Sequence, residues 1–433
     1  MQNAPSSRLA SSSGTRFVPA TLLACLFVAI TLPPVLAGLG GNFVAGDMAT
    51  FHLPQINLFI GSPFAVFDYE ATSATTPGYH WLLALFARLS GYAEVDAATL
   101  PLRLANLAVG LAVVLGFWAI LQRLSGDGWR AAVLTVPLLA SSYVLNAAIW
   151  VVTDNAALLG YVLMLAALLF QPDRPGRAAL AGLLAVASRQ IYLPIVAAIA
   201  LPLMVERWTT WGVGRRMLAI ALPVAPVLAW AIAWQGLTPP RFQDFNAAQF
   251  NPAVPLHALA LTGLFACVYA PFAWRFVRSE GYARAAALAI GAAVLALALW
   301  LIVPTAYSDQ DGRWGSLVWL FAKLLPAPGG HAPLVLPLIA GGLAALAVMA
   351  WHAWRRRYLP VELAMLLLYF AGYAFQPLAW QRYIEPVILI TMGVFVARLD
   401  APRWALLGPA VTALLFGMLA LGRIWGWVPR LFG

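Results

Sequence analysis

Long apolar runs separated by short polar segments form the main pattern of the chain. The first run covers residues 17–40. Further runs cover residues 99–121, 131–150, 155–171, 217–236, 255–274, 284–304, 332–352, 360–378, 384–398 and 404–424. Most of them approach the length of ~20 apolar residues that an α-helix needs to cross the hydrocarbon core of a bilayer. The pattern predicts an all-α polytopic membrane protein.

The apolar stretch 178–206 needs a separate interpretation. Arginines flank it on both sides, so it crosses the membrane an even number of times, yet it is too short for two ordinary spans. We predict a hairpin of two short helices, with Arg189 and Gln190 near its tip and Pro194 opening the second arm. Irregular backbone of this kind is stable at membrane depth only where protein or a watery cavity covers it. The hairpin brings the predicted bundle to about 13 transmembrane helices.

The amino-acid composition excludes a soluble protein. Hydrophobic residues make up 62% of the chain and charged residues only 10%, against roughly a quarter charged in soluble domains. We therefore treat residues 1–433 as a single membrane domain. The formal net charge of +10 comes from arginines that punctuate apolar runs, so we expect no nucleic-acid partner. Cys25 and Cys267 both lie in apolar runs, which indicates neither a disulfide framework nor a cysteine-bound metal.

Arginines also set the expected orientation of the bundle. They gather in alternate short segments, around residues 8–16, 123–130, 174–177, 207–216, 275–284, 355–357 and 398–403. Basic loops stay in the cytoplasm, so these segments are predicted to be cytoplasmic. The first apolar run is then a transmembrane helix, with a signal peptide as the alternative. Most acidic residues and histidines fall on the outer side, where we expect the binding or chemistry.

The largest outer segment covers residues 41–98 and contains two predicted short helices. One covers residues 48–59 and ends before a Gly-Ser-Pro turn. The other covers residues 80–88, where apolar positions recur over two helical turns that are too short to span the bilayer. We interpret the second as an amphipathic helix in the membrane interface, with Tyr79 and Trp81 at headgroup depth.

Several motifs along the chain occur in the order typical of one enzyme family. They are Asp47 followed by Phe51-His52-Leu53-Pro54-Gln55, Thr75-Thr76-Pro77-Gly78-Tyr79, Leu102-Arg103-Leu104-Ala105-Asn106, Thr153-Asp154, Arg189-Gln190, Trp234-Gln235-Gly236, Asp311-Gly312-Arg313-Trp314, and Arg382-Tyr383 with Pro386. The set resembles the dolichyl-phosphate-glucose α-1,2-glucosyltransferases of the GT-C glycosyltransferase superfamily. The resemblance covers nearly the whole chain. One departure is Asp47, which stands alone where that family has adjacent acids directly before Phe-His.

The resemblance implies a GT-C-like helical bundle with interfacial helices in its first outer loop. It also implies an inverting transfer of a hexose, glucose in that family, from a polyprenyl-phosphate donor to a glycolipid or lipid-linked glycan. The reaction would take place at the outer membrane surface, among membrane lipids and with no cofactor or metal. Lysine occurs only at Lys323 while alanine and arginine are frequent, which is typical of high-GC bacteria and favours a bacterial inner membrane.

Acidic residues supply the candidates for proton transfer, because an inverting transfer needs a carboxylate near the acceptor hydroxyl as general base. Asp47 is the leading candidate, and its alternative role is to cap the helix 48–59. Asp154 is a candidate for acceptor binding, or for capping the apolar helix that follows it. Glu70 is the reserve base. His52 is a candidate for binding acceptor or phosphate, with a structural role as the alternative.

Arginines are the candidates for binding the departing phosphate, because a guanidinium binds phosphate through two parallel hydrogen bonds. Arg189 and Arg382 come first, accompanied by Gln190 and Tyr383 in their motifs. The alternative for both arginines is a structural ion pair inside the bundle, since charges within membranes often pair. Lower-ranked phosphate candidates are Arg103 and Arg313. The Asp-x-Asp at residues 309–311 lacks supporting ligands in sequence and is interpreted as a solvated loop.

A transporter or flippase for a lipid or glycan is the alternative function class. Such proteins are also polytopic and carry scattered arginines within the membrane. They usually show paired halves or interrupted spans at corresponding positions, and this sequence shows no such repeat. The long first outer loop with its interfacial helices favours the enzyme.

Overall fold

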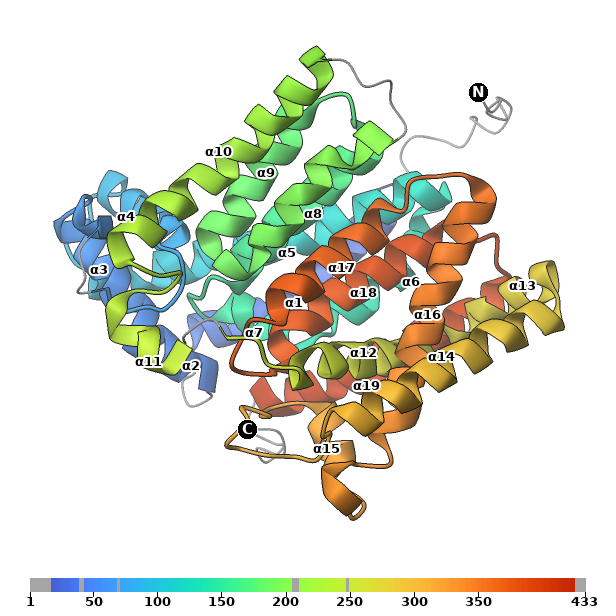
Figure 1. The fold of residues 1–433 in the computed structure, drawn as a ribbon. Helices are drawn as coiled ribbons and strands as arrows, with labels where there is room; N and C mark the ends of the chain where they lie inside the picture. The colour runs from blue at the N-terminus through green and yellow to red at the C-terminus, as the bar shows by residue number, and fades with distance from the viewer. Residues whose placement is uncertain (1–16, 39–42, 68–70, 205–209, 247–248, 425–433) are drawn as a thin grey trace.

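The structure is a computed structural model that describes residues 17–38, 43–67, 71–204, 210–246 and 249–424. Every regular element in these residues is a helix, which confirms the predicted all-α class (Figure 1). The longer helices are α1 (Val18–Leu36), α5 (Val95–Ser125), α6 (Gly128–Leu139), α8 (Asp154–Phe170), α9 (Pro175–Ser188), the 3₁₀ helix η4 (Gln190–Met204), α10 (Thr210–Trp234), α12 (Ala253–Ala266), α13 (Ala270–Glu280), α14 (Tyr282–Ile302), α16 (Val335–Arg356), α17 (Val361–Tyr373), α18 (Gln381–Ala397) and α19 (Leu407–Ile424).

Shorter helices connect these elements. They are α2 (Phe43–Asp47), the π-helical turn η2 (Met48–His52), α3 (Leu53–Gly61), η3 (Ala65–Phe67), α4 (Gly78–Leu89), α7 (Ser142–Ile149), η5 (Pro240–Phe242), α11 (Gln243–Asn246), η6 (Cys267–Tyr269), α15 (Leu317–Lys323), η7 (Pro328–Gly330) and η8 (Arg403–Leu406). The helix α15 falls in an outer segment where no helix is predicted from the sequence.

The helices confirm a multi-pass integral membrane protein. Within the described residues, seven helices are long and apolar enough to cross a membrane, or eight if the bent pair α6–α7 counts as one span. The remaining predicted crossings correspond to the shorter helices α8, α9, η4, α17 and α18. The predicted hairpin at 178–206 is also confirmed, because α9 and η4 pack against each other and meet at Arg189.

The predicted single crossing at 131–150 is wrong in one respect. It is two helices, α6 and α7, bent by 74° at residues 140–141. Side chains from neighbouring helices hold the second, short helix α7 (Ser142–Ile149) in place. Asn106 donates to the carbonyl of Trp150 at 2.7 Å, and Asn155 donates to the carbonyl of Val144 at 2.9 Å. Broken backbone survives inside a membrane protein where such partners cover it.

The first outer segment differs from its prediction in two ways. Helical backbone already begins at Phe43 and continues through a π-helical turn to Gly61. The turn lies just before Pro54, whose ring lacks an N–H and would clash with a carbonyl four residues earlier in a regular helix. Tyr79 does not face the membrane, because it is buried and donates a hydrogen bond to Asn106 at 2.7 Å. Trp81 remains partly exposed, as an interfacial residue would be.

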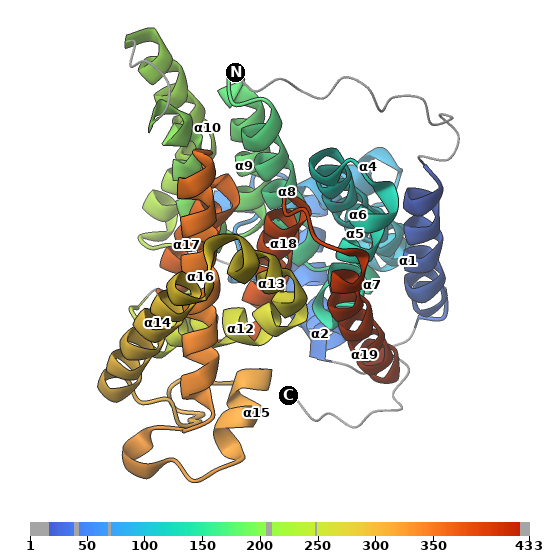
Figure 2. The ribbon, with the colours of Figure 1, turned by 90° about the vertical axis from the view of Figure 1, so that its right-hand side faces the viewer.

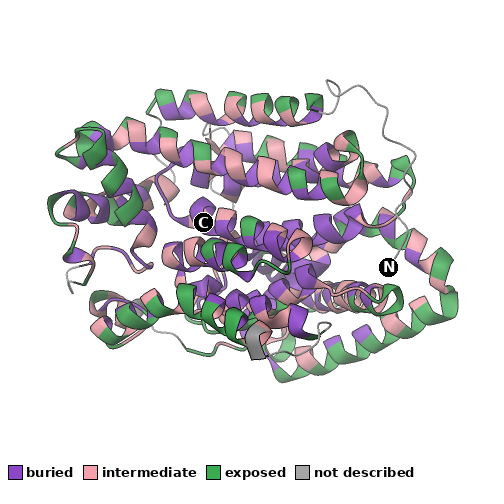
Figure 3. Ribbon diagram, turned by 90° about the horizontal axis from the view of Figure 1, so that it is seen from above, coloured by how far each residue is buried: buried purple, intermediate pink, exposed green. Residues whose placement is uncertain are grey.

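The core of the bundle lies around α18 and α8, with α1 and α14 toward opposite edges (Figure 2). Nearly every residue of α18 is buried, whereas α14 exposes most of its apolar side chains. Figure 3 shows buried residues concentrated in the middle of the bundle and exposed residues along its outer helices. At Gly160 the backbones of α8 and α9 approach so closely that a Cβ would lie 2.4 Å from the amide nitrogen of Ala185. The short helices α3, α4 and α11 lie at one end of the bundle, and the α13–α14 turn lies at the other (Figure 1).

Candidate functional site

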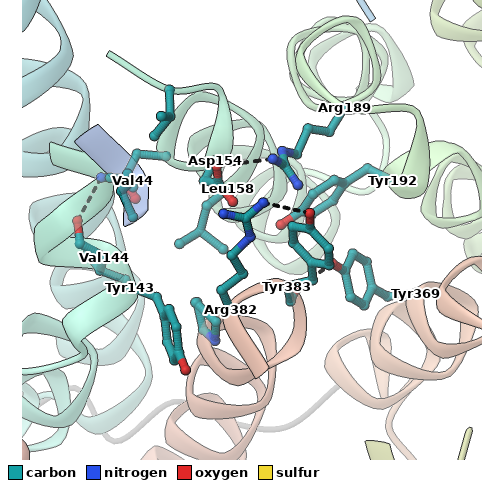
Figure 4. A pocket seen from close by; sticks show the side chains of 14 residues that line it. Val44, Tyr143, Val144, Asp154, Leu158, Arg189, Tyr192, Tyr369, Arg382 and Tyr383 are labelled. Carbon is teal, nitrogen blue, oxygen red and sulfur yellow. Dashed lines mark hydrogen bonds and ion pairs between the residues drawn. The ribbon is translucent and has the colours of Figure 1, made fainter. Parts of the chain in front are cut away.

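Two acid–arginine pairs from four distant segments meet at the end of the bundle that carries α2–α4. A carboxylate oxygen of Asp47, the last residue of α2, lies 2.8 Å from Nη1 of Arg382 in the first turn of α18. A carboxylate oxygen of Asp154, at the start of α8, lies 3.2 Å from Nη2 of Arg189 between α9 and η4 (Figure 4). All four are candidates selected from the sequence, and the fold brings them together.

Tyr383 connects the two pairs. Arg382 donates from Nη2 to the hydroxyl of Tyr383 at 2.8 Å, and the Arg189 guanidinium lies 4.7 Å from the centre of the same ring. Arg189 also donates from Nε to the hydroxyl of Thr153 at 3.0 Å. The two guanidiniums therefore share one aromatic neighbour, and their charges are balanced by the two carboxylates. Figure 4 shows Arg189, Arg382 and Tyr383 converging on one cavity.

That cavity is small. Its volume is about 30 Å³, and its lining includes Asp154, Arg189, Arg382 and Tyr383. A volume of this size holds about two or three water molecules, because a water needs roughly 10–15 Å³ measured in this way. Pockets that bind organic ligands are an order of magnitude larger, at roughly 300–1,000 Å³. The site therefore has too little free volume for an organic ligand in this conformation, and its charged groups are bonded to each other.

The capping alternatives for the two acids do not hold. Asp47 has helical backbone angles inside continuous helical structure and makes no capping hydrogen bond. Thr153, the N-cap of α8, makes no side-chain capping bond, and its hydroxyl accepts from Arg189 instead. The ion-pair alternative for Arg189 and Arg382 is observed. A buried pair of this kind is compatible with either a structural or a chemical role.

Gln190 joins three of the sequence motifs. Its side-chain oxygen accepts from the backbone N–H of Thr76 at 3.1 Å, and its side-chain nitrogen donates to the carbonyl of Ala74 at 2.8 Å. The same nitrogen lies 3.3 Å from the carbonyl of Leu237, directly after the Trp-Gln-Gly motif. Gln190 therefore fixes the loop before α4 against the tip of the hairpin, one residue from Arg189.

His52 forms a buried pair with His80. Their rings stack with centroids 5.0 Å apart, and Nδ1 of His52 lies 2.7 Å from Nε2 of His80. Burial, His80 and the nearby arginines Arg189 and Arg382 lower the pKa of His52 well below its usual value. Burial and Arg189 lower the pKa of His80 to about 3. Both imidazoles are therefore neutral at physiological pH, and His52 presents no cationic group to a phosphate.

Arg103 and Arg313 lie outside the cavity lining. Arg103 donates to the carbonyls of Ile149 at 3.0 Å and Pro34 at 3.1 Å, and thus ties the ends of α7 and α1 to α5. Arg313 is buried beside the ring of Trp319, and its guanidinium lies 3.6 Å from the carboxylate of Asp311. These partners are backbone carbonyls and local side chains, which suits a structural role for both arginines.

The remaining acidic candidates lie apart from this site. Glu70 falls outside the described residues. Asp309 and Asp311 are exposed, and the hydroxyl of Tyr307 donates to Asp309, which raises the pKa of Tyr307 to about 12. No group of three potential metal ligands occurs among the described histidine, cysteine and acidic residues.

Several residues of the site were not selected from the sequence. Tyr143, Tyr192 and Tyr369 line the cavity, and the rings of Tyr192 and Tyr369 lie 4.8 Å apart. Glu385 lies outside the cavity lining, is buried one turn beyond Arg382 and accepts from the hydroxyl of Ser141 at 2.6 Å. Glu385 was detectable, because an ionisable residue inside a predicted span is a functional candidate by default. The tyrosines gave no such signal, since aromatic residues are ordinary in apolar runs.

Comparisons with known proteins give one distant likeness. No protein-family model matches the sequence, and no curated protein matches it significantly. Among solved structures, the chain is similar to the crystal structure of ArnT from Cupriavidus metallidurans in the apo state, with a TM-score of 0.37 and 18% identity. The similarity covers 87% of this chain and 77% of that chain.

Proposed function

We propose that the protein is an inverting membrane glycosyltransferase of the GT-C type that uses a polyprenyl-phosphate sugar. The observation that carries this proposal is the double pair Asp47–Arg382 and Asp154–Arg189 around Tyr383. The acids and the arginines match the two requirements of glycosyl transfer. A carboxylate can accept the proton of the acceptor hydroxyl, and guanidiniums can bind the departing phosphate.

In the proposed reaction, an acceptor hydroxyl oxygen attacks the anomeric carbon of the donor sugar. The bond from that carbon to the phosphate oxygen breaks, and the polyprenyl phosphate leaves with the electron pair. Asp47 takes the proton of the hydroxyl, and Arg382 and Arg189 stabilise the charge on the departing phosphate. Buried guanidiniums are effective here because few water molecules screen them.

The small volume of the cavity implies that Arg382 and Arg189 exchange their carboxylate partners when the donor binds. Phosphate oxygens can replace the carboxylates on Arg382 and Arg189 through the same charge-assisted hydrogen bonds. Asp47 would then lose its guanidinium partner and become available to the acceptor hydroxyl. The ion pairs seen in this conformation thus hold the arginines in place until a phosphate arrives.

The sequence supports a proposal for the membrane side and the substrates. The arginine pattern favours a site on the outer side, which in a bacterial inner membrane is the periplasmic face. The resemblance to dolichyl-phosphate-glucose glucosyltransferases favours a hexose, with glucose as the first choice, and a glycolipid or lipid-linked glycan as the acceptor.

Radiolabel transfer tests the proposal. Purified protein in lipid nanodiscs is incubated with synthetic polyprenyl-phosphate [14C]hexoses and extracted membrane glycolipids, and products are separated by thin-layer chromatography. We expect label in a glycolipid with inverted anomeric configuration, together with equimolar polyprenyl phosphate. The matched control is Asp309→Asn, which changes an exposed acid of another outer segment and should transfer normally.

Two results would contradict the proposal. One is label that never leaves its polyprenyl carrier with any hexose or acceptor fraction. The other is movement of intact labelled lipid between the two leaflets of proteoliposomes without chemical change, which would identify a transporter.

A further inference from the structure

A second, larger cavity lies at the opposite end of the bundle from the acid–arginine pairs. Its volume is about 850 Å³, and it lies between α12–α13, α16 and the last turns of α18. From Tyr383 to Phe395, which lines this cavity, α18 rises by about 18 Å at 1.5 Å per residue. The two cavities are therefore separate, and α18 contributes to both.

The packing of α12 against α16 explains why the cavity exists. The two helices touch closely at Gly263 and Gly342, where a Cβ on Gly342 would lie 2.0 Å from the carbonyl oxygen of Leu259. The cavity begins beside this contact and is lined by later residues of both elements, up to Ser279 on one and Arg356 on the other. Pro271 and the 3₁₀ turn η6 interrupt the first element there, so the helices separate beyond the contact.

The walls and the rim of the cavity differ in chemistry. Its walls are apolar, with Phe272, Phe276, Met349 and Phe395 among the lining residues. Its lining also contains four arginines and one carboxylate, which are Arg275, Arg278, Arg356, Arg398 and Asp400. A ligand that fits must therefore combine an apolar body with an anionic end.

Two of the four arginines are already neutralised. Arg398 lies 3.1 Å from the buried carboxylate of Glu362, and Arg275 lies 2.5 Å from Asp400. Arg278 and Arg356 are exposed, and neither forms an ion pair with any carboxylate in the described part of the chain. The uncompensated positive charge of the rim therefore comes from these two arginines.

We propose that this cavity binds one anionic phospholipid, with its phosphate at Arg278 and Arg356 and an acyl chain between α13, α16 and α18. The arginine topology places this end of the bundle at the cytoplasmic leaflet, where basic pockets between helices bind anionic headgroups. A soluble anion would leave the apolar walls unused, and a neutral lipid would leave the two arginines uncompensated. The volume lies within the range of pockets that bind organic ligands.

Lipid titration of the purified full-length protein tests this site. Phosphatidylglycerol and phosphatidylcholine with identical acyl chains are added to delipidated protein in neutral detergent. Binding is followed by native mass spectrometry and by the melting temperature. We expect phosphatidylglycerol to saturate at one tightly bound molecule and to raise the melting temperature, with at least about tenfold weaker binding of phosphatidylcholine, since tenfold corresponds to losing one good charge contact.

Two variants and one control locate the binding. Arg278→Gln with Arg356→Gln removes the free charges and should weaken phosphatidylglycerol binding at least tenfold. Ala345→Phe fills the apolar part without changing charge and should have a similar effect. The matched control is Arg174→Gln with Arg177→Gln, two exposed arginines of another predicted cytoplasmic loop, and it should bind like the parent protein.

Three results would overturn the proposal. One is unchanged phosphatidylglycerol binding in both cavity variants. A second is equal weakening in the control pair, which would indicate general surface charge. The third is a site that binds polyprenyl phosphate but not phosphatidylglycerol, which would assign the cavity to the carrier lipid. Inorganic phosphate should not compete, because it lacks the apolar chain.

Discussion

The two ends of α18 use arginine in opposite ways. At its first turn, Arg382 is largely buried and bonded to Asp47 beside a cavity of about 30 Å³. At the other end, Arg278 and Arg356 lie exposed at the rim of a cavity of about 850 Å³. The cavity at the first turn of α18 is small, and its arginine is neutralised by a carboxylate. The cavity at the other end is large, and its rim carries a net positive charge.

The difference shows that the role of an arginine in such a bundle depends more on its partners than on its position in the sequence. A buried guanidinium needs a carboxylate or several carbonyls, because removing its hydration costs several kcal/mol. An exposed guanidinium at the membrane surface keeps its hydration and attracts anionic lipid from a distance. Both kinds contribute equally to a hydropathy plot, yet only the buried kind is fixed tightly enough for chemistry.

The prediction with the largest expected effect concerns the orientation of the protein in the membrane, because the two ends of α18 must face different compartments. Single cysteines at residues 309–315 should react with a membrane-impermeant thiol reagent in intact cells. Cysteines at residues 123–130 and 355–358 should react only after the membrane is opened, because arginine bias sets orientation. The opposite pattern would place the acid–arginine pairs in the cytoplasm and remove the proposed outer reaction.

Asp47→Asn should have the largest effect on activity. Asparagine keeps the shape of the side chain but cannot take a proton, so transfer should fall by at least about a hundredfold. Donor binding should persist, since a neutral asparagine competes less than a carboxylate with phosphate for Arg382. The measurement is single-turnover transfer together with donor binding in the same preparation.

Asp400→Asn is the matched control for Asp47→Asn, because it also removes the acid of an acid–arginine pair, at the other end of α18 and fully exposed. It should transfer at the parental rate. Normal turnover in a well-folded Asp47→Asn protein would exclude Asp47 as the base and direct attention to Asp154 and Glu385.

Arg189 should contribute mainly to donor binding. Arg189→Ala should raise the apparent KM for the donor sharply, by about tenfold or more, since a hydrogen bond to a charged group contributes about 1.5–3 kcal/mol. Arg189→Lys should recover only part of this loss, because a point charge replaces a planar fork. The control is Arg275→Lys in the larger cavity at the other end of α18, which should leave the apparent KM for the donor unchanged. If the alanine variant works normally at limiting donor, Arg189 is a structural residue.

The smallest effect is expected from the histidine pair. The pKa values of His52 and His80 are lowered by burial, that of His80 to about 3, so the folded state favours their neutral forms. Their contribution to stability is complete above the unfolded pKa of about 6.5 and is lost as pH falls below it, for His80 down to about 3. The loss cannot exceed about 1.4 kcal/mol per pH unit for each histidine.

The melting temperature between pH 7.5 and pH 5 measures this loss. His80→Gln keeps a nitrogen near Nε2 but removes one titrating group, so its melting temperature should fall less steeply with pH than that of the parent. Identical slopes in the two proteins would show that the pair does not control the pH dependence of stability.

Most of the helical layout could be predicted from the sequence because apolar runs and arginines report directly on burial and orientation. The separate placement of α7 after the bend could not, since Asn106 and Asn155, which bond to its carbonyl at Val144 and to that of Trp150, come from other segments. The burial of Tyr79 has the same origin, because its partner Asn106 is remote in sequence. Local patterns do not contain such contacts.

In the candidate site, too, the sequence identifies residues but not their partners. Asp47, Asp154, Arg189 and Arg382 were identifiable as charged residues in an apolar chain, but their pairing required the fold. Arg103, a lower-ranked candidate from the same sequence reasoning, instead ties two helix ends together. A charge in a membrane segment therefore indicates that a partner exists, while the fold decides which partner it is.

The 3₁₀ helix η4 changes how many residues a crossing requires. Its 15 residues rise by about 2.0 Å each and thus extend about 30 Å, the same length as about twenty residues of α-helix. Pro194 and Pro202 lie within it and supply no N–H, which disfavours a regular α-helix over the same residues. A rise of 1.5 Å per residue would make this segment of the bundle too short to span a bilayer. The length of η4 therefore matches the hydrocarbon core of a bilayer although it has only 15 residues.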